Sequence, residues 1–480
     1  MLDRLIEWVL DDPKGIFWLA GMAGTGKTSI AVTLCRMLQE NPDVLLGGTF
    51  FCSRTASNEA RSDIRRIVPT LVALLANRSS LFATRVAVEL RPDFGGAASM
   101  PAGDQVRTLL QKPLAALASE NRPIVFVIDA LDETDNEHDL SALLAAIATF
   151  SSPAQVKFIL TSRPETQFLG CPISDQAQND ILHLHTINPK EVTQDIRLYI
   201  DRMFAQDPLD DSEDWYSESD VHALANIANG LFIFAATAIT YITDSKSAYY
   251  RTFRLSTVLT AMNNSKPFMT PLDNMYEFVL TRASSTTKVE PMELEVTLHA
   301  LACILGARMP LSVDALAELL GHRPDVLMDS LRRLHAVIHV PEELDQPGLR
   351  ALHASLGDYL FERAAPNIRI TSSLGDELFA RSSLILMEKK LCFNIAQSRT
   401  SYEANSPTKP DSITLSLEYA CLQWVYHISN LPEGSNFDSD INTVIRSRFL
   451  FWLEVMSVIG QVQRAAAMLN IAASMVNLLS

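Results

Sequence analysis

The segment Gly21–Thr28 has the residue types and the spacing of a polyphosphate-binding turn. It reads GMAGTGKT, with glycines at both ends of the turn, followed by Lys27 and Thr28. Glycines allow consecutive backbone N–H groups to turn inward around one anion. A lysine at this place reaches the β- and γ-phosphates of a nucleotide, and the hydroxyl after it reaches Mg²⁺. The residues expected to bind the nucleotide are Gly21, Met22, Ala23, Gly24, Thr25, Gly26, Lys27, Thr28 and Ser29.

The sequence on both sides of this turn predicts a strand before it and a helix after it. Gly15–Gly21 is a short apolar run of the kind found in buried strands, and Ser29–Leu38 places Ile30, Leu34 and Leu38 on one helical face. A helix that begins at the turn adds the attraction of its N-terminal N–H groups for an anion. The alternative is a glycine-rich turn that binds nothing.

A second apolar run, Pro123–Asp129, ends in a carboxylate. Asp129 is expected to orient Mg²⁺, partly through water, together with Thr28. Asp132 and Glu133 follow, and a carboxylate just past a strand end can polarise the water that attacks the γ-phosphate. Glu133 is the first candidate for this catalytic role and Asp132 the competing one.

An alternative role for these polar residues is structural. Asp132 or Thr134 could cap the helix predicted near Leu140–Ala148, because short polar side chains are preferred at helix N-termini.

Two further residues are candidates for contacts with phosphate. Arg163 follows the apolar run Lys157–Thr161, and its guanidinium offers a two-pronged donor that can sense a γ-phosphate. The alternative is a surface ion pair. His353 could donate to the β-phosphate of a bound diphosphate, although a single histidine is more often a structural residue.

Composition argues against several kinds of partner and compartment. The 480 residues carry 56 acidic and 40 basic side chains, for a net charge of −16, which does not suit nucleic acid or an anionic membrane. The six cysteines are widely spaced, as in a reduced cytoplasmic protein with neither a zinc site nor disulfides. The longest apolar run, Gly230–Ile242, is too short to cross a bilayer. Only 20 residues precede Gly21, which leaves no room for a preceding effector domain.

The order of patterns along the chain predicts four domains. Strand-length runs alternate with helical patterns up to about residue 190, as in a parallel α/β sheet. Helical patterns follow, and a helix–helix–helix–hairpin order near 271–365 indicates a winged helix. DNA reading is not favoured, because Val326–Leu334 carries only Arg332 and Arg333. The predicted domains are 1–190 for nucleotide binding, 191–270 as a helical lid, 271–365 as the winged helix and 366–480 as a C-terminal helical domain.

The order of motifs resembles one known family. GMAGTGKT, PIVFVIDALDE, KFILTSRPE and LHASLGDYL follow each other as in the NACHT group of STAND signalling ATPases, and most closely as in fungal NLR-like proteins that often carry WD repeats. The resemblance implies a P-loop NTPase fold of the ASCE/AAA+ type with a parallel sheet. It further implies that the chain holds the switch core without effector or repeat domains. One departure is Gly230-Leu231-Phe232, where many relatives have Gly-x-Pro, so the choice between ATP and GTP stays open.

The resemblance also implies a function. Lys27, Thr28, Asp129, Arg163 and His353 fall at the family's phosphate, Mg²⁺, sensor and ADP-contacting positions. The implied protein is a switch, closed with ADP (or GDP) and open with the triphosphate, that hydrolyses slowly and associates with itself when active. Its implied setting is nonself recognition or programmed cell death in a fungus, with unknown protein partners. The alternatives are an AAA+-like remodelling ATPase and a non-catalytic scaffold that nucleotide stabilises.

Overall fold

The computed structural model divides the chain into two compact units, which are described separately. The first comprises Met1–Arg54 and Asn58–Asn263, and the second Thr55–Ser57 and Asn264–Ser480. The predicted four-domain boundaries stay a prediction. The structure describes residues 1–13, 15–53, 59–90, 100–134, 136–152, 154–164, 179–184, 187–206, 215–264, 269–284, 291–398, 400, 409–432, 435 and 437–477.

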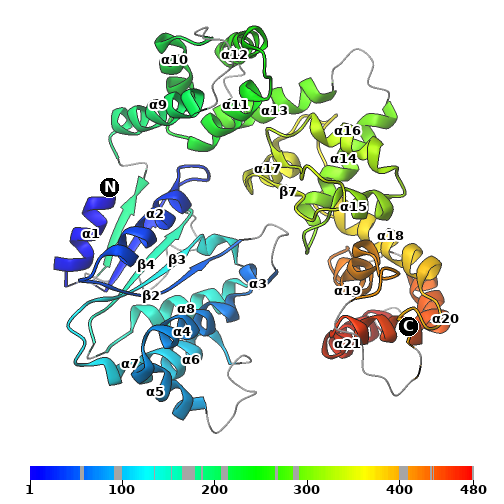
Figure 1. Ribbon diagram of the computed structural model, residues 1–480, viewed down its shortest axis with the longest axis horizontal. Helices are drawn as coiled ribbons and strands as arrows, with labels where there is room; N and C mark the ends of the chain where they lie inside the picture. The colour runs from blue at the N-terminus through cyan, green and yellow to red at the C-terminus, as the bar shows by residue number, and fades with distance from the viewer. Residues whose placement is uncertain are drawn as a thin grey trace. The chain divides into compact units, whose positions relative to one another are not determined.

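The first unit is built on a five-stranded parallel sheet with the order β2-β3-β4-β1-β5 (Figure 1). This architecture confirms the predicted α/β class. Because all strands run the same way, their carboxyl ends meet at one edge of the sheet, where ligands bind in open α/β folds. The strands are β1 (Ile16–Ala20), β2 (Leu45–Phe51), β3 (Ile124–Asp129), β4 (Val156–Ser162) and β5 (Asn179–His183).

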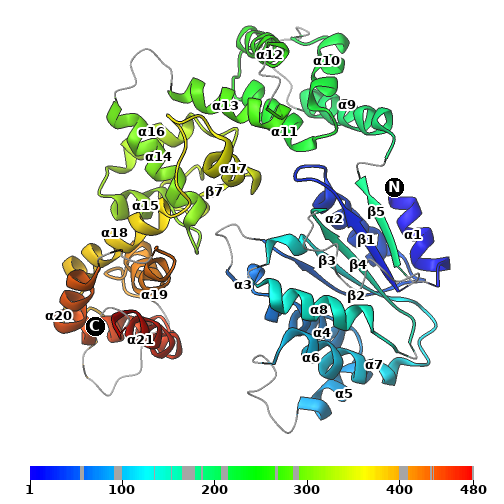
Figure 2. The same ribbon diagram turned by 180° about the vertical axis from the view of Figure 1, so that it is seen from behind.

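Helices cover both faces of this sheet, which explains why its strands read as continuous apolar runs. Figures 1 and 2 show α1 (Leu2–Asp11) and α2 (Lys27–Glu40) on one face, and α4 (Ile67–Arg78) and α8 (Glu137–Ala148) on the other. Alternate residues of one strand serve the two layers: Val125 and Val127 pack toward α2, while Phe126 packs on the opposite side.

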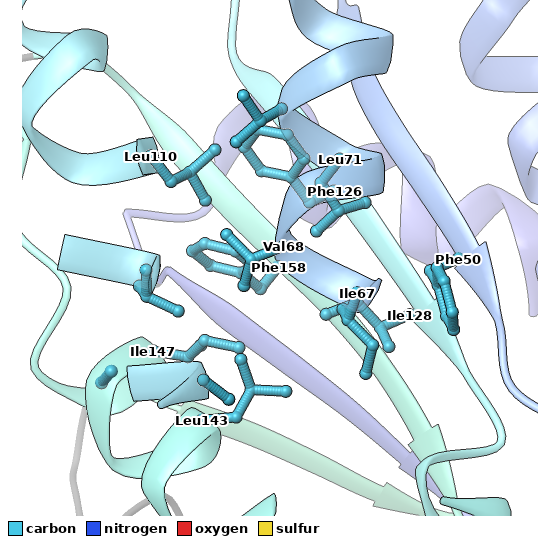
Figure 3. Close-up of a cluster of buried hydrophobic side chains, with 14 of the residues drawn as sticks. Phe50, Ile67, Val68, Leu71, Leu110, Phe126, Ile128, Leu143, Ile147 and Phe158 are labelled. Carbon is cyan, nitrogen blue, oxygen red and sulfur yellow. The ribbon is translucent and has the colours of Figure 1, made fainter. Parts of the chain in front are cut away.

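The layer on the α4 side holds the larger core (Figure 3). Phe126 and Phe158 of neighbouring strands stack with their ring centroids 5.5 Å apart, and Leu71 and Leu143 cover them from the two helices. Further helical turns complete this layer, namely α3 (Glu59–Ser62), η1 (Ile64–Arg66), α5 (Ser80–Leu90), α6 (Ala102–Gln105), η3 (Val106–Gln111), α7 (Lys112–Leu114) and η4 (Ala115–Leu117).

A buried lysine fastens α1 to the far end of β4. The Lys157 ammonium donates to the backbone oxygens of Trp8, at 2.7 Å, and Asp12, at 2.5 Å, and lies 4.5 Å from the centroid of the Trp8 indole. Burial lowers the pKa of Lys157, and the nearby Asp12 and Asp11 oppose that shift. The Trp8 oxygen also accepts the Asp12 N–H at 3.2 Å, so the ammonium adds a second bond at the C-terminal end of α1, where a cation is favourable.

Four helices follow the sheet within the first unit: α9 (Pro189–Gln206), α10 (Glu218–Ala228), α11 (Phe232–Thr243) and α12 (Ala248–Asn263). The helical pattern of residues 221–242 is divided between two helices, α10 and α11. Asn229 and Gly230 have φ values of 47° and 83°, and this left-handed pair ends α10 before α11 begins.

The second unit is helical apart from a two-stranded hairpin. Its antiparallel strands β6 (Ile338–His339) and β7 (Arg350–Ala351) follow α14, α15 and α16, in the order expected of a winged helix. The helical elements are α13 (Pro271–Ser284), α14 (Pro291–Gly306), α15 (Val313–Leu320), α16 (Pro324–Arg332), α17 (Ser355–Asp358), η8 (Tyr359–Arg363), α18 (Leu374–Lys390), α19 (Leu415–Ser429), α20 (Asp438–Val458) and α21 (Val462–Asn477).

A buried polar chain ties α18 to α19 in this unit. His427 is fully buried, and its Nδ1 lies 2.6 Å from the Asp376 carboxylate and its Nε2 2.8 Å from the Tyr419 hydroxyl. Phe379 stacks on the same imidazole with centroids 4.8 Å apart. Bonding both ring nitrogens satisfies a group that would otherwise be costly to bury.

None of the helices within the described ranges has the length and apolar character needed to cross a bilayer.

Candidate nucleotide-binding site

The phosphate loop lies between the end of β1 and the start of α2, as its sequence predicts. Gly24 and Gly26 have φ values of 79° and 90°, in the left-handed region that favours glycine. A Cβ atom on Gly21 would lie 2.8 Å from both Leu184 Cδ1 and Thr25 Oγ1. Close packing and left-handed backbone therefore explain the three glycines, and the loop keeps the open backbone that a phosphate needs.

Lys27 is buried at the first position of α2 and bends back over the loop. Its Nζ donates to the backbone oxygens of Gly21, at 2.6 Å, and Met22, at 3.0 Å. Burial lowers the pKa of the ammonium, and the carboxylate that most opposes this shift is that of Asp132. A buried ammonium held over the loop is placed to attract phosphate oxygens.

Asp129 ends β3 with its two carboxylate oxygens accepting from two hydroxyls. Thr28 donates to Oδ2 at 2.7 Å and Thr161 to Oδ1 at 2.6 Å. Burial raises the pKa of Asp129, and these two hydrogen bonds oppose the shift. The structure therefore joins the loop's hydroxyl to the carboxylate of a strand two places away in the sheet.

The donor set around Asp129 suits Mg²⁺, a hard cation that binds oxygen and keeps several waters and phosphate oxygens in its shell. Thr28 and Asp129 supply a hydroxyl and a carboxylate at hydrogen-bond distance from each other. Within the described ranges, no group of three or more His, Cys, Asp or Glu side chains is placed to hold a metal ion. Thr28 and Asp129 are the residues that would hold Mg²⁺ beside a bound polyphosphate.

Asp132 and Glu133 follow β3 in the short helix η5 (Leu131–Glu133). Asp132 is buried and accepts from Arg163 twice, from the backbone N–H at 3.0 Å and from Nε at 3.1 Å. The alternative in which Asp132 or Thr134 caps α8 is wrong, because the Asn136 side chain caps that helix. Both Asp132 oxygens thus accept from Arg163, and Glu133 stays the first candidate to orient a water.

Arg163 directly follows β4, the strand between β1 and β3, so its backbone lies between the phosphate loop and Asp129. It makes the ion pair that the structural alternative predicts, but with a partner inside the candidate site. Arg163 and Asp132 are 22% and 8% exposed, so this pair is not a surface pair.

His353 belongs to the second unit, and its Nδ1 bonds within its own turn. The Ser355 N–H donates to Nδ1 at 3.1 Å, and the Ser355 hydroxyl lies 2.7 Å from the same nitrogen. Because Nδ1 accepts, a neutral imidazole carries its proton on Nε2. A role for His353 in nucleotide binding stays a prediction.

The first turn of α11 covers the phosphate loop, and the sequence pattern does not predict this contact. The Ile233 N–H, in the first turn of α11, donates to the Gly24 oxygen at 3.2 Å. A Cβ on Gly24 would lie 1.9 Å from Ile233 Cγ2. Phe232 also reaches the loop, 3.6 Å from the place of a Gly26 Cβ. The Gly230-Leu231-Phe232 departure from the family pattern points to this segment, but it does not identify the contact.

Cys52 lies beside the site without the properties of a nucleophile. Its backbone N–H donates to the backbone oxygen of Asp129 at 3.0 Å. Burial is the main cause that raises the pKa of the Cys52 thiol, and Asp129 adds to the shift. The thiol therefore stays protonated at neutral pH and packs as an apolar group.

Ala130, between Asp129 and η5, has a left-handed backbone with φ 56° and ψ 49°. Its N–H donates to Thr161 Oγ1 at 2.9 Å. We expect Ala130→Gly to raise local stability by about 0.5–1 kcal/mol, because relief of left-handed strain outweighs the greater freedom of glycine in the unfolded chain. Hydrogen exchange of the β3 amides measures this change. The control Ala145→Gly, inside α8, should lower stability by about 1 kcal/mol. Faster hydrogen exchange of the β3 amides in Ala130→Gly would contradict the idea that the left-handed backbone of Ala130 is strained.

Sequence comparison relates this site to known proteins. Residues 3–163 match the family model described as Nephrocystin 3, N-terminal, a range that includes the phosphate loop, Asp129 and Arg163. The chain is 22% identical over 489 residues to the vegetative incompatibility protein HET-E-1 of Podospora anserina. That alignment covers 94% of this chain and 34% of the relative, so the chain spans about a third of this curated relative's length.

Solved structures show weaker similarity. A STAND (Signal Transduction ATPase with Numerous Domains) protein with a tetratricopeptide repeat sensor, from Pyrococcus horikoshii, gives a TM-score of 0.38 at 12% identity. The match covers 99% of this chain and 64% of that one. Cdc6p from Pyrobaculum aerophilum gives 0.32 at 13% identity, covering 78% and 92%. At TM-scores this low, neither similarity bears on function.

Proposed function

We propose, from the premise that this chain is a relative of the NACHT-type STAND NTPases, that it is a nucleotide-operated switch. It binds ATP or GTP with Mg²⁺, hydrolyses the triphosphate slowly and is closed in the diphosphate state. The triphosphate state opens it and allows copies to associate. Since the relative HET-E-1 is a vegetative incompatibility protein, we place the switch in fungal nonself recognition or programmed cell death, in the cytoplasm.

One observation carries this proposal, the hydrogen bond from Thr28 to Asp129 beside the Lys27 ammonium. The three residues come from the loop and from β3, 101 positions apart, and meet at the carboxyl edge of the sheet. A glycine-rich turn without a function needs no carboxylate from another strand. A nucleotide–Mg²⁺ site needs this combination of ammonium, hydroxyl and carboxylate.

The residues divide the chemistry between them. The loop N–H groups and Lys27 bind the β- and γ-phosphates, and Thr28 and Asp129 would hold Mg²⁺. When bound, Mg²⁺ would neutralise charge on the phosphate oxygens. Glu133 orients a water toward the γ-phosphate, and Arg163 binds the γ-phosphate with its guanidinium. The site holds two cationic side chains against three carboxylates (Asp129, Asp132, Glu133), and this balance favours slow turnover in a switch over fast turnover in a motor.

His353 is proposed to hold the diphosphate state. Its Nδ1 accepts from the Ser355 N–H, which leaves the proton on Nε2 and makes that nitrogen the donor. An Nε2–H group can donate to a β-phosphate oxygen, so a bound diphosphate would keep the winged helix in its closed position.

We expect His353→Ala to weaken ADP binding about fivefold to tenfold and to change binding of a non-hydrolysable triphosphate by less than twofold, since one hydrogen bond to a charged group is lost only in the diphosphate state. Calorimetric titration of both nucleotides measures this difference. His322→Ala, in the same unit, is the matched control and should change neither constant. Equal weakening of both nucleotides would remove the role of His353.

The proposal is tested by identifying the nucleotide that co-purifies with the chain and by measuring turnover and mass in each nucleotide state. ADP or GDP in the purified protein, slow hydrolysis and a larger assembly with the triphosphate analogue support the switch. Several turnovers per second in a stable ring would instead indicate a remodelling ATPase. Tight ADP without hydrolysis or change of shape would indicate a scaffold.

A further inference from the structure

The ion pair between Asp132 and Arg163 is the feature of the site that nucleotide binding does not explain. Asp132 Oδ1 accepts the Arg163 backbone N–H at 3.0 Å, and Oδ2 accepts Nε at 3.1 Å. The carboxylate is 8% exposed and the arginine side chain 22%. One charge-assisted bond holds the half-buried guanidinium at Nε, and the other fixes the Arg163 backbone, so the residue is held more firmly than in a surface pair.

The sheet explains why these two residues meet. Asp132 follows β3 and Arg163 follows β4, and the two strands are hydrogen-bonded neighbours with Ile128 opposite Leu160. Asp132 is also the carboxylate with the strongest influence on the Lys27 ammonium. One carboxylate therefore acts on both cations that a γ-phosphate would meet.

We propose that Asp132 competes with the γ-phosphate for Arg163, and that this competition sets the preference for diphosphate over triphosphate. The inference rests on the proposed function. A diphosphate leaves the Asp132–Arg163 pair intact. A triphosphate has to take Arg163 from Asp132 and so breaks the pair. Only the triphosphate carries this penalty, and a ligand shifts an equilibrium only by such a difference between states.

This role makes Asp132 a positioning residue. It holds the guanidinium at the edge of the site until a stronger anion arrives, while Glu133 keeps the role of orienting water. The pair then disfavours the triphosphate state. The strength of the pair determines how much triphosphate is needed to open the switch.

The test is a double-mutant cycle on the full chain, with Kd for Mg-ADP and for the Mg²⁺ complex of the non-hydrolysable analogue AMPPNP measured by calorimetry. In Asp132→Asn, the ratio Kd(ADP)/Kd(AMPPNP) should rise about tenfold. In an Arg163→Ala background, the same change should move the ratio by less than twofold. A rise that persists without Arg163 would be general repulsion between Asp132 and phosphate, and it would overturn the competition.

Asp139→Asn is the matched control, because Asp139 pairs with Arg65 at 3.0 Å and is 10% exposed. This variant loses the same charge and the same kind of pair in the same unit, and its ratio should stay within twofold of the wild type. A tenfold rise here would overturn the inference. A wild-type chain that binds neither nucleotide would instead defeat the proposed function.

A measurement on the unaltered chain covers the case in which Asp132→Asn does not fold. The Arg163 Nε–H signal, assigned by its loss in Arg163→Lys, reports its hydrogen-bond acceptor in nitrogen-15 spectra. It should stay in place when ADP is added and shift when AMPPNP is added. A signal that shifts equally with both nucleotides, or with neither, would contradict the exchange of partners.

Discussion

Replacing Lys27 by alanine should weaken binding of both ADP and the triphosphate at least about 100-fold. The ammonium is buried over the loop and within 3.0 Å of two loop oxygens, so its loss removes a partly desolvated cation from the place of the phosphates. Truncating one partner of a buried, hydrogen-bonded charge pair removes about 2–5 kcal/mol of binding free energy. Fluorescence anisotropy with labelled ATP and GTP measures the loss.

Two controls make this result interpretable. Lys112→Ala removes a largely exposed lysine that pairs loosely with Glu89, at 3.7 Å, and should leave both Kd values unchanged. Lys27→Met keeps the aliphatic part of the side chain over the loop and should bind as poorly as Lys27→Ala. Binding within threefold of the wild type in either Lys27 variant would place the nucleotide elsewhere.

Replacing Gly24 by alanine should separate α11 from the phosphate loop, with a loss of about 3 kcal/mol. A Cβ there would lie 1.9 Å from Ile233 Cγ2 and 2.8 Å from Ile233 Cβ, atoms close to the backbone that cannot swing aside. The φ value of 79° adds left-handed strain. Overpacking and strain contribute about 1–3 and 1–2 kcal/mol. Hydrogen exchange of peptides covering residues 231–243 should report the loss of protection.

The cause is isolated by a second change and a matched glycine. Gly24→Ala combined with Ile233→Ala removes the clash but keeps the strain, so about half of the lost protection should return. Gly321→Ala introduces the same kind of strain at φ 71° with nothing within 4 Å, and it should cost only about 1–2 kcal/mol in its own helix. If the double variant recovers nothing, the contact between Gly24 and Ile233 is not what holds α11.

The sheet was predictable because its strands are apolar on both sides. The apolar runs Ile16–Leu19 and Ile124–Asp129 are long enough to be predicted as buried strands without knowledge of their neighbours in the sheet. The motifs at the ends of these strands predict a resemblance to NACHT-type STAND NTPases, and the family match and the similarity to HET-E-1 support it. The start of β2 is hard to predict, because Gly47 and Gly48 interrupt its apolar pattern. In the structure a Cβ on Gly48 would lie 3.1 Å from the Leu71 backbone, so close packing of α4, not a turn, explains this glycine.

In the candidate site, residues in contiguous motifs were predictable, whereas contacts between residues far apart in the sequence were not. The phosphate loop is a contiguous motif, and Asp129 and Arg163 can be predicted as site residues because each stands at the end of an apolar strand. The covering of Gly24 by Ile233 and the pairing of Asp132 with Arg163 join residues that lie 209 and 31 positions apart. Such contacts depend on the order of strands and on where a helix begins, which residue patterns in one sequence do not specify.

Strand β4 has a mechanical consequence. Lys157 near its beginning holds α1, Arg163 follows its end, and about 20 Å of backbone separates them at the usual rise of a strand. Hydrogen bonds to β1 and β3 fix this strand along both edges. These bonds oppose sliding or stretching of the strand, so β4 behaves as a rigid element. A displacement that nucleotide binding caused at the carboxyl end of β4 would not be taken up by deformation of the strand. The motion would have to occur in the turns at the carboxyl edge of the sheet and in the helices that cover them.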